Sequence, residues 1–157
     1  MWNEFKELLL SWFEKVKSLF VEEVEEMEPI RTRFEHLEKN VFLGNGYPAT
    51  IRIALAEDAT RIFEVEKAAY DGDSPWAKNV LEKDVTQNPA AIYIVLEVEG
   101  NIVGFVGART TQVTDLHITN VAVLPDYRFL NVATLLLKAL EKIARALDKK
   151  EITLEAR

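Results

Sequence analysis

The sequence predicts an α/β fold in which a mixed central sheet is flanked by helices, with an amphipathic helix added at the N-terminus. Three observations support this prediction. The 157 residues include 48% hydrophobic and 29% charged types, the balance of a globular domain with a packed core. Segments with the two-residue period of strands alternate with segments that have the 3.6-residue period of helices. A hairpin meander is followed by a crossover through a helix, which combines antiparallel and parallel strands in one sheet.

Residues 1–28 are predicted to form one amphipathic helix, because large apolar side chains recur at three- and four-residue steps until Pro29. The segment has a net charge of −5, from three Lys and eight Glu. An acidic polar face is unfavourable on anionic lipid surfaces. The preferred interpretation is that this helix packs on its own domain or on a copy of itself. Docking on a membrane surface or on a partner helix is the alternative.

Residues 29–48 are predicted to be a linker, and residues 49–157 to be the main domain. The turn signals Gly44-Asn45-Gly46 and Tyr47-Pro48 mark the boundary. In the domain, strands are predicted at 50–54, 91–99, 102–110, 115–124 and 151–156. Helices are predicted at 58–70, at 74–87 and at 135–147.

Two local signals fix parts of this pattern. Ser74-Pro75-Trp76 predicts a helix start, since Ser is a favoured N-cap and Pro fits the first turn. Glu99-Gly100-Asn101 predicts a tight hairpin turn. One face of the strand at 91–99 is expected to carry Ile92, Ile94, Leu96 and Val98.

The composition excludes several classes of function. With 19 Lys and Arg against 26 Asp and Glu, the net charge of −7 disfavours nucleic-acid binding. The absence of Cys excludes disulfides, thiolate metal sites and cysteine nucleophiles. Only His36 and His117 could serve as imidazole ligands, so no metal is expected. The sequence lacks an apolar run long enough to span a membrane, and its N-terminus lacks the features of a signal peptide. These features fit a cytoplasmic location.

The segment from Asn120 to Ala133 is the most informative for chemistry. It runs from a buried strand through a short turn into a helix. Such a junction presents unpaired backbone N–H groups beside a helix N-terminus, which is a favourable place for a phosphate. Arg128 adds a cation there. The alternative is a plain strand-to-helix turn in which Phe129 and Leu130 pack locally.

Two sequence motifs are distinctive. The first is residues 70–76, Tyr-Asp-Gly-Asp-Ser-Pro-Trp, and the second is residues 117–128, His-Ile-Thr-Asn-Val-Ala-Val-Leu-Pro-Asp-Tyr-Arg. With these motifs the chain resembles the GNAT acyl-CoA N-acyltransferase family, and most of all the bacterial ribosomal-protein alanine N-acetyltransferases (RimI-like proteins). Residues 152–157 match the strand that follows in the family. The resemblance covers about residues 50–157 and implies a GNAT-type sheet.

The resemblance also implies a binding site for acetyl-CoA. In the family, the pantetheine arm pairs with the main chain of the third long strand. Here that strand contributes Val121, Ala122 and Val123. The pyrophosphate is held by a turn of pattern Gln/Arg-x-x-Gly-x-Gly/Ala. The matching residues here are Arg128, Phe129, Leu130, Asn131, Val132 and Ala133, and the predicted cofactor site extends to Thr134. Asn131 replaces a usual Gly, and Asn tolerates the left-handed backbone better than most residues do.

Glu155 is the catalytic residue that the resemblance implies. It matches a Glu that acts as general base in the RimI-like proteins, and removing a proton from an α-ammonium frees its lone pair to attack the thioester. The alternative is a solvated strand carboxylate. The family continues with a helix that carries an acidic Tyr and with two further strands. The sequence ends before these elements, so we expect an incomplete domain with an exposed last strand.

The expected function is therefore transfer of acetyl from acetyl-CoA to a protein N-terminal amine, with alanine of a ribosomal protein suggested by resemblance alone. The partner is a protein or peptide N-terminus, and Asp71 and Asp73 are expected near it as attractors or as turn residues. Self-association through the N-terminal helix or the last strand is a further expectation. A catalytically impaired scaffold protein and a GNAT acting on a small amine remain alternatives. His117 is expected to be a structural residue.

Overall fold

The computed structural model describes residues 2–26, 28–111 and 114–154, and within the first helix it describes the side chains of residues 3–15. The helices are α1 (Trp2–Glu26), α2 (Ile30–Phe34), α3 (Ala59–Ala69), α4 (Lys78–Gln87) and α5 (Val132–Ala146), with 3-10 turns η1 (Ala56–Asp58) and η2 (Pro125–Tyr127). The strands are β1 (Glu38–Phe42), β2 (Pro48–Ile53), β3 (Ala91–Val98), β4 (Asn101–Thr110), β5 (Asp115–Val123) and β6 (Glu151–Leu154).

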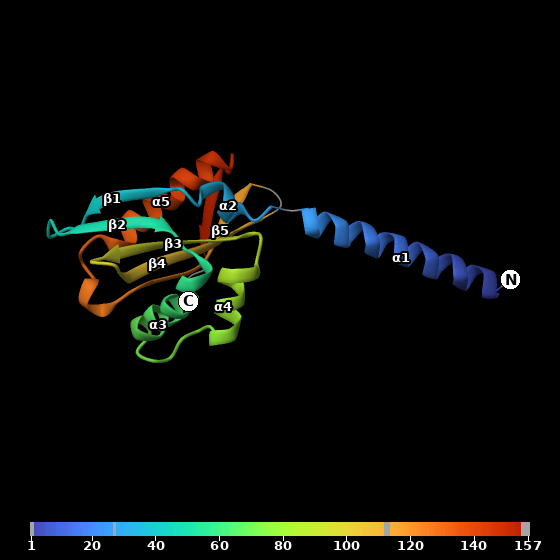
Figure 1. The fold of residues 1–157 in the computed structure, drawn as a ribbon, viewed down its shortest axis with the longest axis horizontal. Coiled ribbons are helices and arrows are strands. Elements are labelled where there is room, and N and C mark those ends of the chain that lie inside the picture. Colours follow the sequence, from blue (N-terminus) through green and yellow to red (C-terminus); the bar gives the residue numbers. More distant parts are fainter. Residues whose placement is uncertain (1, 27, 112–113, 155–157) are drawn as a thin grey trace.

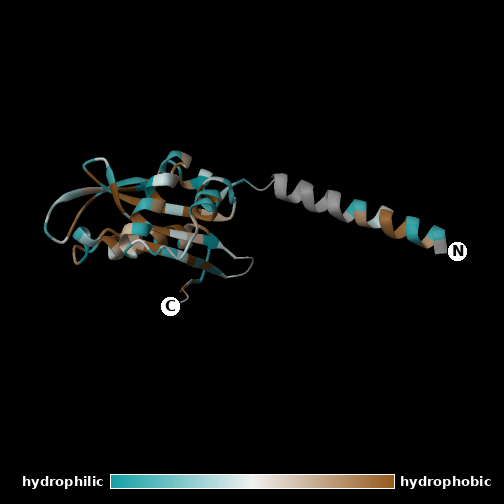
Figure 2. Cartoon of the chain, turned by 90° about the horizontal axis from the view of Figure 1, so that it is seen from below, coloured by the Kyte–Doolittle hydropathy of each residue, from teal (hydrophilic) through white to brown (hydrophobic). Residues whose placement is uncertain are grey.

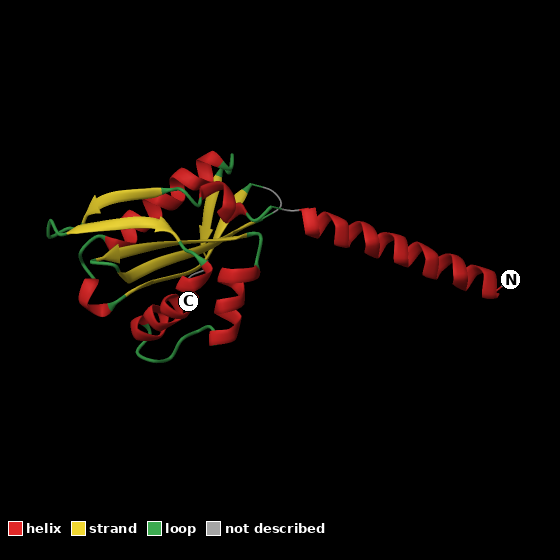
Figure 3. Ribbon diagram, in the orientation of Figure 1, coloured by secondary structure: helices red, strands yellow, loops and turns green. Residues whose placement is uncertain are grey.

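The six strands form one sheet in the order β1-β2-β3-β4-β5-β6. Neighbours from β1 to β5 are antiparallel, and β6 runs parallel to β5. The parallel pair is joined by α5, as expected for a crossover connection. The prediction of a mixed α/β sheet with helices on its faces is therefore confirmed (Figures 1 and 3).

The sheet is covered on both faces, so the fold has three layers (Figure 1). On one face, Leu136, Leu140 and Ile143 of α5 pack into the core together with Ile30 of α2. On the other face, helices α3 and α4 form a second core. Strand β3 supplies both cores, because Ile92, Ile94, Leu96 and Val98 face α5 while Tyr93 and Val95 face α3 and α4. The predicted alternation of this strand is confirmed.

Three predictions differ from the structure by three residues or more. Residues predicted to be a linker include α2 and β1, and β1 pairs with β2 as the outer strand. The polar sequence Glu38-Lys39-Asn40 gives this strand no hydrophobic pattern, because an edge strand buries few side chains. The helix predicted from Ser74 begins at Lys78, because the Ser74 hydroxyl accepts from the Trp76 amide at 3.2 Å and closes a local turn instead. Helix α5 begins at Val132, three residues earlier than predicted.

Helix α1 extends away from the sheet (Figure 1). Its first half carries large apolar side chains that are exposed, among them Leu8 at 70%, Trp12 at 60% and Phe13 at 59%. In Figure 2 the described half of α1 alternates between hydrophobic (brown) and hydrophilic (teal) segments. The described side chains of α1 do not pack on the domain, and packing on a second copy stays a prediction. Among the described residues, none of the helices combines the length and the apolar character required to cross a bilayer.

Candidate active site

The described residues of β6 pair with only the first part of β5. The parallel pairing covers Asp115–Ile118 of β5 and Glu151–Leu154 of β6. On that side, residues 119–123 of β5 have no strand partner within the described chain. We call this segment the open edge of β5. The Leu124 amide donates to the Val103 carbonyl of β4 at 2.8 Å. Because main-chain direction alternates along a strand, the polar groups of Val123 and Val121 point away from β4 into the opening.

A β-bulge lies at the start of the open edge of β5. Gly107 pairs with Asn120 and Ala108 pairs with Ile118, so Thr119 is an extra residue in β5. Beyond the bulge, the side chain of Asn120 faces α3, whereas Ile118 before it packs in the α5 core. Gly107 is required here, since a Cβ at this position would lie 2.3 Å from Asn120 Oδ1. Close packing at Gly107 thus stabilises the β-bulge, after which the side chains of β5 point to the opposite faces.

Residues 128–134, which we call the amide turn, connect β5 to α5 and are rich in free donors. No described residue accepts a hydrogen bond from the backbone N–H groups of residues 129–134. Asn131 has φ 65° and Phe129 has φ 64°, so both adopt the left-handed backbone that curls the turn. These donors precede a helix of 15 residues, whose dipole places partial positive charge at the same point. The arrangement is suited to an anion such as a diphosphate.

A surface cavity of about 330 Å³ lies against the amide turn. It is lined by Val123, Tyr127, Arg128, Phe129, Asn131, Val132, Ala133 and Thr134. Most residues predicted to bind a cofactor are therefore brought together, and Val123 joins the cavity to the open edge of β5. Ala122 lies between Val121 and Val123 but packs in the α3 core.

Arg128 and Leu130 have structural contacts beside the cavity. A guanidinium nitrogen of Arg128 donates to the Ala69 carbonyl at the end of α3, at 2.8 Å. The side chain thus bridges the amide turn and α3. Leu130 packs against the α5 core, whereas Phe129 is fully exposed. The alternative in which both side chains pack locally is right for Leu130 and wrong for Phe129.

A buried polar cluster lies under the bulge, on the α3 side. The Glu66 carboxylate is fully buried and accepts from the Ser74 hydroxyl at 2.6 Å and from the Asn120 amide at 3.3 Å. The Thr119 hydroxyl donates to Asn120 Oδ1 at 3.0 Å. A chain of hydrogen bonds therefore links the bulge in β5 to the loop after α3. Sequence reasoning missed this cluster, because Glu66 lies in a helix with charged residues and only two positions after the exposed Glu64.

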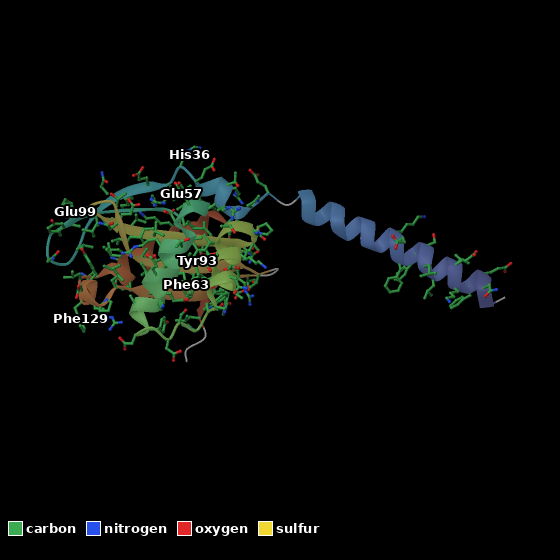
Figure 4. The ribbon with its side chains drawn as sticks, turned by 60° about the horizontal axis from the view of Figure 1, so that its bottom comes forward. His36, Glu57, Phe63, Tyr93, Glu99 and Phe129 are labelled. Carbon is green, nitrogen blue, oxygen red and sulfur yellow. The ribbon has the colours of Figure 1, made fainter. Side chains whose placement is uncertain are left out.

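Tyr93 borders the same cluster and is buried (Figure 4). Its hydroxyl donates to Asp84 of α4 at 2.5 Å. Burial raises the pKa of Tyr93 well above its usual value, and the hydrogen bond to the Asp84 carboxylate raises it further. Tyr93 is thus a neutral donor that fixes α4 on the sheet.

Three side chains connect β5 to β6 where these strands still pair. The Thr153 hydroxyl donates to Asp115 at 2.6 Å, which leaves its oxygen to accept from His117 Nδ1 at 2.8 Å. Asp115 also accepts from the Thr111 hydroxyl. Hydrogen bonds from Thr111 and then from Thr153 lower the pKa of Asp115. This cluster gives His117 the structural role that we predict for it.

Glu155, the predicted catalytic residue, lies outside the described residues. The last described residue of β6, Leu154, pairs with Ile118, which immediately precedes the bulge. In the described part of the chain, no group of three or more His, Cys, Asp or Glu is placed to hold a metal ion.

Comparisons with known proteins agree with this geometry. The model of the acetyltransferase (GNAT) family matches residues 52–157. The chain is 29% identical over 109 residues to a Bacillus subtilis (strain 168) protein that carries the name ribosomal protein bS18-alanine N-acetyltransferase, covering 69% of this chain and 70% of that one.

Solved structures share the fold. The ribosomal-protein-S18-alanine N-acetyltransferase of Escherichia coli has a TM-score of 0.63 at 21% identity, over 69% of this chain and 67% of that chain. The paia N-acetyltransferase of Thermoplasma acidophilum, in complex with coenzyme A, has a TM-score of 0.60 at 16% identity, over 69% and 79% of the two chains. Aminoglycoside acetyltransferases are also among the similar structures. The family match extends over more than half of the chain and includes both the open edge of β5 and the amide turn, so the chain belongs to the acetyltransferase (GNAT) family and is an acetyl-CoA-dependent N-acyltransferase.

Proposed function

We propose that this protein transfers acetyl from acetyl-CoA to the N-terminal amine of a protein, with alanine of a ribosomal protein as the acceptor. The observation that carries the proposal is the continuity of the open edge of β5 with the amide turn through Val123. An extended amide-containing arm and a diphosphate, joined end to end, fit these two surfaces. The acceptor is suggested by the Bacillus subtilis relative.

The residues present fit the two parts of coenzyme A. The outward main-chain groups of Val121 and Val123 have no strand partner among the described residues, so they could pair with the amides of the pantetheine arm, as an added strand would. The N–H groups of residues 129–134 are free to bind the diphosphate. Ala122 contributes by keeping β5 fixed to the α3 core between these two outward residues. Acetyl-CoA supplies the activated acetyl group as a thioester.

The chemistry requires one base and one oxyanion donor. An α-ammonium has a pKa of about 8, so loss of one proton at neutral pH exposes a nucleophilic lone pair. We assign this proton to Glu155, directly or through a water molecule. The amine nitrogen then bonds to the thioester carbon, the C–S bond breaks, and the thiolate leaves. The Val123 N–H is directed into the opening and is assigned to the developing oxyanion. The products are the N-acetyl amide, the free thiol and one proton.

The loop after α3 is proposed to help recruit the acceptor. Asp71 and Asp73 are exposed there, and the loop is held to β5 through Ser74, Glu66 and Asn120. Two carboxylates near the opening would attract a positively charged N-terminus. The effect is expected to weaken at high salt.

The test combines binding and turnover. Acetyl-CoA is titrated by calorimetry, and acetylation of an Ala-starting peptide is followed by mass spectrometry. Glu155→Gln should reduce turnover by about 100-fold or more and leave the affinity for CoA nearly unchanged. Glu151→Gln, at an exposed carboxylate of the same strand, is the matched control and should keep normal turnover.

Each other outcome has a distinct meaning. Binding without turnover on any amine would support the scaffold alternative. Turnover on a polyamine or an aminoglycoside but not on the peptide would replace the acceptor and keep the reaction. An unchanged rate in Glu155→Gln would reject the assigned base. Failure to bind acetyl-CoA would reject the proposal.

A further inference from the structure

Phe129 is an aromatic side chain without support from its own fold. Its relative exposure is 101%, the highest among the exposed large apolar side chains of the described residues. Figure 4 shows its ring at the rim of the domain, directed away from the ribbon. Its apolar neighbours Tyr127 and Leu130 both pack against the α5 core, so Phe129 is the one large apolar side chain of residues 127–130 that is left exposed.

A phenylalanine at position 129 is unfavourable for two reasons, one that concerns its side chain and one that concerns its backbone. A full benzyl group is left in water, and the backbone at φ 64° is in the left-handed region that non-glycine residues disfavour. A small polar residue would avoid the first cost at this position. An interaction with a ligand would explain why an aromatic ring stands here.

The position of the ring limits what the ligand can be. Phe129 lines the same cavity of about 330 Å³ as Val123 and the start of α5. A CoA molecule with its diphosphate on the amide turn sends its pantetheine arm along the open edge of β5. Its nucleoside must then leave the turn at the outer rim, where Phe129 stands.

The scarcity of cationic side chains near the rim favours stacking of the ligand on Phe129 over ion pairing with it. The segment from Phe129 to Thr134 contains no Lys or Arg. Arg128 already donates to the Ala69 carbonyl at 2.8 Å. The nucleotide end of the ligand therefore meets an aromatic ring and backbone amides, with the one nearby guanidinium partly engaged.

We propose that Phe129 is a stacking platform for the adenine base of CoA and so determines the preference for the nucleotide end of the cofactor. This inference rests on the proposed function and deepens it. Base stacking on an aromatic side chain tolerates an exposed position, since the ring and the base cover each other when the ligand binds.

The experiment measures binding, not turnover. The full chain and Phe129→Ala are titrated with CoA and with 4′-phosphopantetheine, which lacks the adenosine, its 3′-phosphate and one phosphate of the diphosphate. Phe129→Ala should weaken CoA binding roughly five- to tenfold and leave 4′-phosphopantetheine binding unchanged. Phe129→Trp should restore CoA binding, whereas Phe129→Leu, which keeps apolar bulk without a π face, should not. Phe42→Ala is the matched control, because Phe42 is also exposed, at 72%, and lies on β1.

A second readout uses etheno-CoA, whose modified base fluoresces and is quenched when stacked. Quenching should occur with the unaltered chain and disappear with Phe129→Ala. Two results would overturn the inference: equal CoA affinities of the unaltered chain and Phe129→Ala, or an equal loss of affinity for CoA and for 4′-phosphopantetheine in Phe129→Ala. In either case, CoA binding by the unaltered chain would still support the proposed function. Absence of CoA binding in the unaltered chain would instead remove the proposed function, and the inference with it.

Discussion

The backbone amide of Gly44 donates a 2.8 Å hydrogen bond to the carbonyl of Leu130. This bond fastens the loop between β1 and β2 to the amide turn, which is 86 positions later in the chain. The hairpin of β1 and β2 thus supports the candidate site, although the sequence predicts most of its residues to be a linker. A turn held in this way can keep its free N–H groups aligned without a ligand.

Substitution of Gly44 should disturb the amide turn more than it disturbs the fold. A Cβ at this position would lie 3.3 Å from the Asn131 side chain and 3.4 Å from the Leu130 backbone. Gly44→Ala fits with a shift of a few tenths of an ångström, whereas Gly44→Val does not. We expect Gly44→Val to weaken CoA binding about tenfold and Gly44→Ala to have little effect. Calorimetric titration compares them, and equal affinities would show that the loop does not support the turn.

The left-handed backbone of Asn131 gives a prediction about stability. Asn131→Ala should lower the stability by about 1 kcal/mol, since Ala adopts this conformation at a higher cost. This loss corresponds to a Tm about 3 °C lower. Asn131→Gly should be neutral or slightly stabilising and should keep CoA binding. Scanning calorimetry measures both variants, and a large loss of stability in Asn131→Gly would mean that the side chain, not the backbone, is required.

The ion cluster of Arg52 predicts a dependence on pH. Arg52 contacts Asp58 at 2.7 Å and Glu97 at 2.6 Å. Burial acts to raise the pKa of Asp58, but hydrogen bonds from Arg52 and from the Leu55 amide outweigh it, so the pKa lies below its usual value. A carboxyl with a lowered folded pKa stabilises the fold above its unfolded pKa of about 3.9. That stabilisation is lost as the pH falls from about 4 through the folded pKa.

Urea unfolding at several pH values tests this cluster. Asp58→Asn should flatten the loss of stability below about pH 4. Arg52→Met should cost about 3 kcal/mol at neutral pH, because it leaves the two carboxylates without their cation. A wild-type pH profile below pH 4 in Asp58→Asn would exclude Asp58 as the group responsible.

Removal of the buried Glu66 carboxylate should lower the free energy of unfolding more than removal of an exposed Glu does. Glu66→Ala removes the acceptor of the Asn120 amide and the nearer of two acceptors of the Ser74 hydroxyl, the other being the Trp76 carbonyl. We expect a loss of about 2 kcal/mol. Glu64→Ala, on the same helix, removes only an exposed contact with Arg61 and should cost less than about 0.5 kcal/mol. Similar losses in the two variants, measured by denaturant unfolding, would contradict the role of the cluster.

The sequence patterns predicted the elements whose periodicity is local. The alternation in β3 and the hairpin at Glu99-Gly100 depend on neighbouring residues, and both are found where predicted. The amide turn was also predictable, because an Asn before an apolar helix is a recognisable signal for left-handed backbone. The free N–H groups that follow are a consequence of the helix start itself.

Other features depend on contacts between distant segments, which periodicity does not report. Strand β1 is stabilised by pairing with β2, not by its own apolar content. The Ser74 turn prevails over the N-cap signal because the same hydroxyl is drawn to the buried Glu66. The bulge at Thr119 follows from a register shift against β4, and its one signal in the sequence is the small residue Gly107.

The extra residue in β5 decides which helical layer each later side chain of the strand meets. Before Thr119, the even-numbered Leu116 and Ile118 fill the layer under α5, and after it the even-numbered Ala122 fills the layer under α3. If β5 paired regularly through Thr119, the second half of the strand would be rotated by half a turn. Asn120 would then face the apolar layer under α5, and Val121 and Val123 would face α3. Deletion of Thr119, in contrast, would remove the bulge and leave each later side chain on its present face, because Asn120 would then follow Ile118 directly. The place of the bulge is thus as much a determinant of the molecule as the identity of its residues.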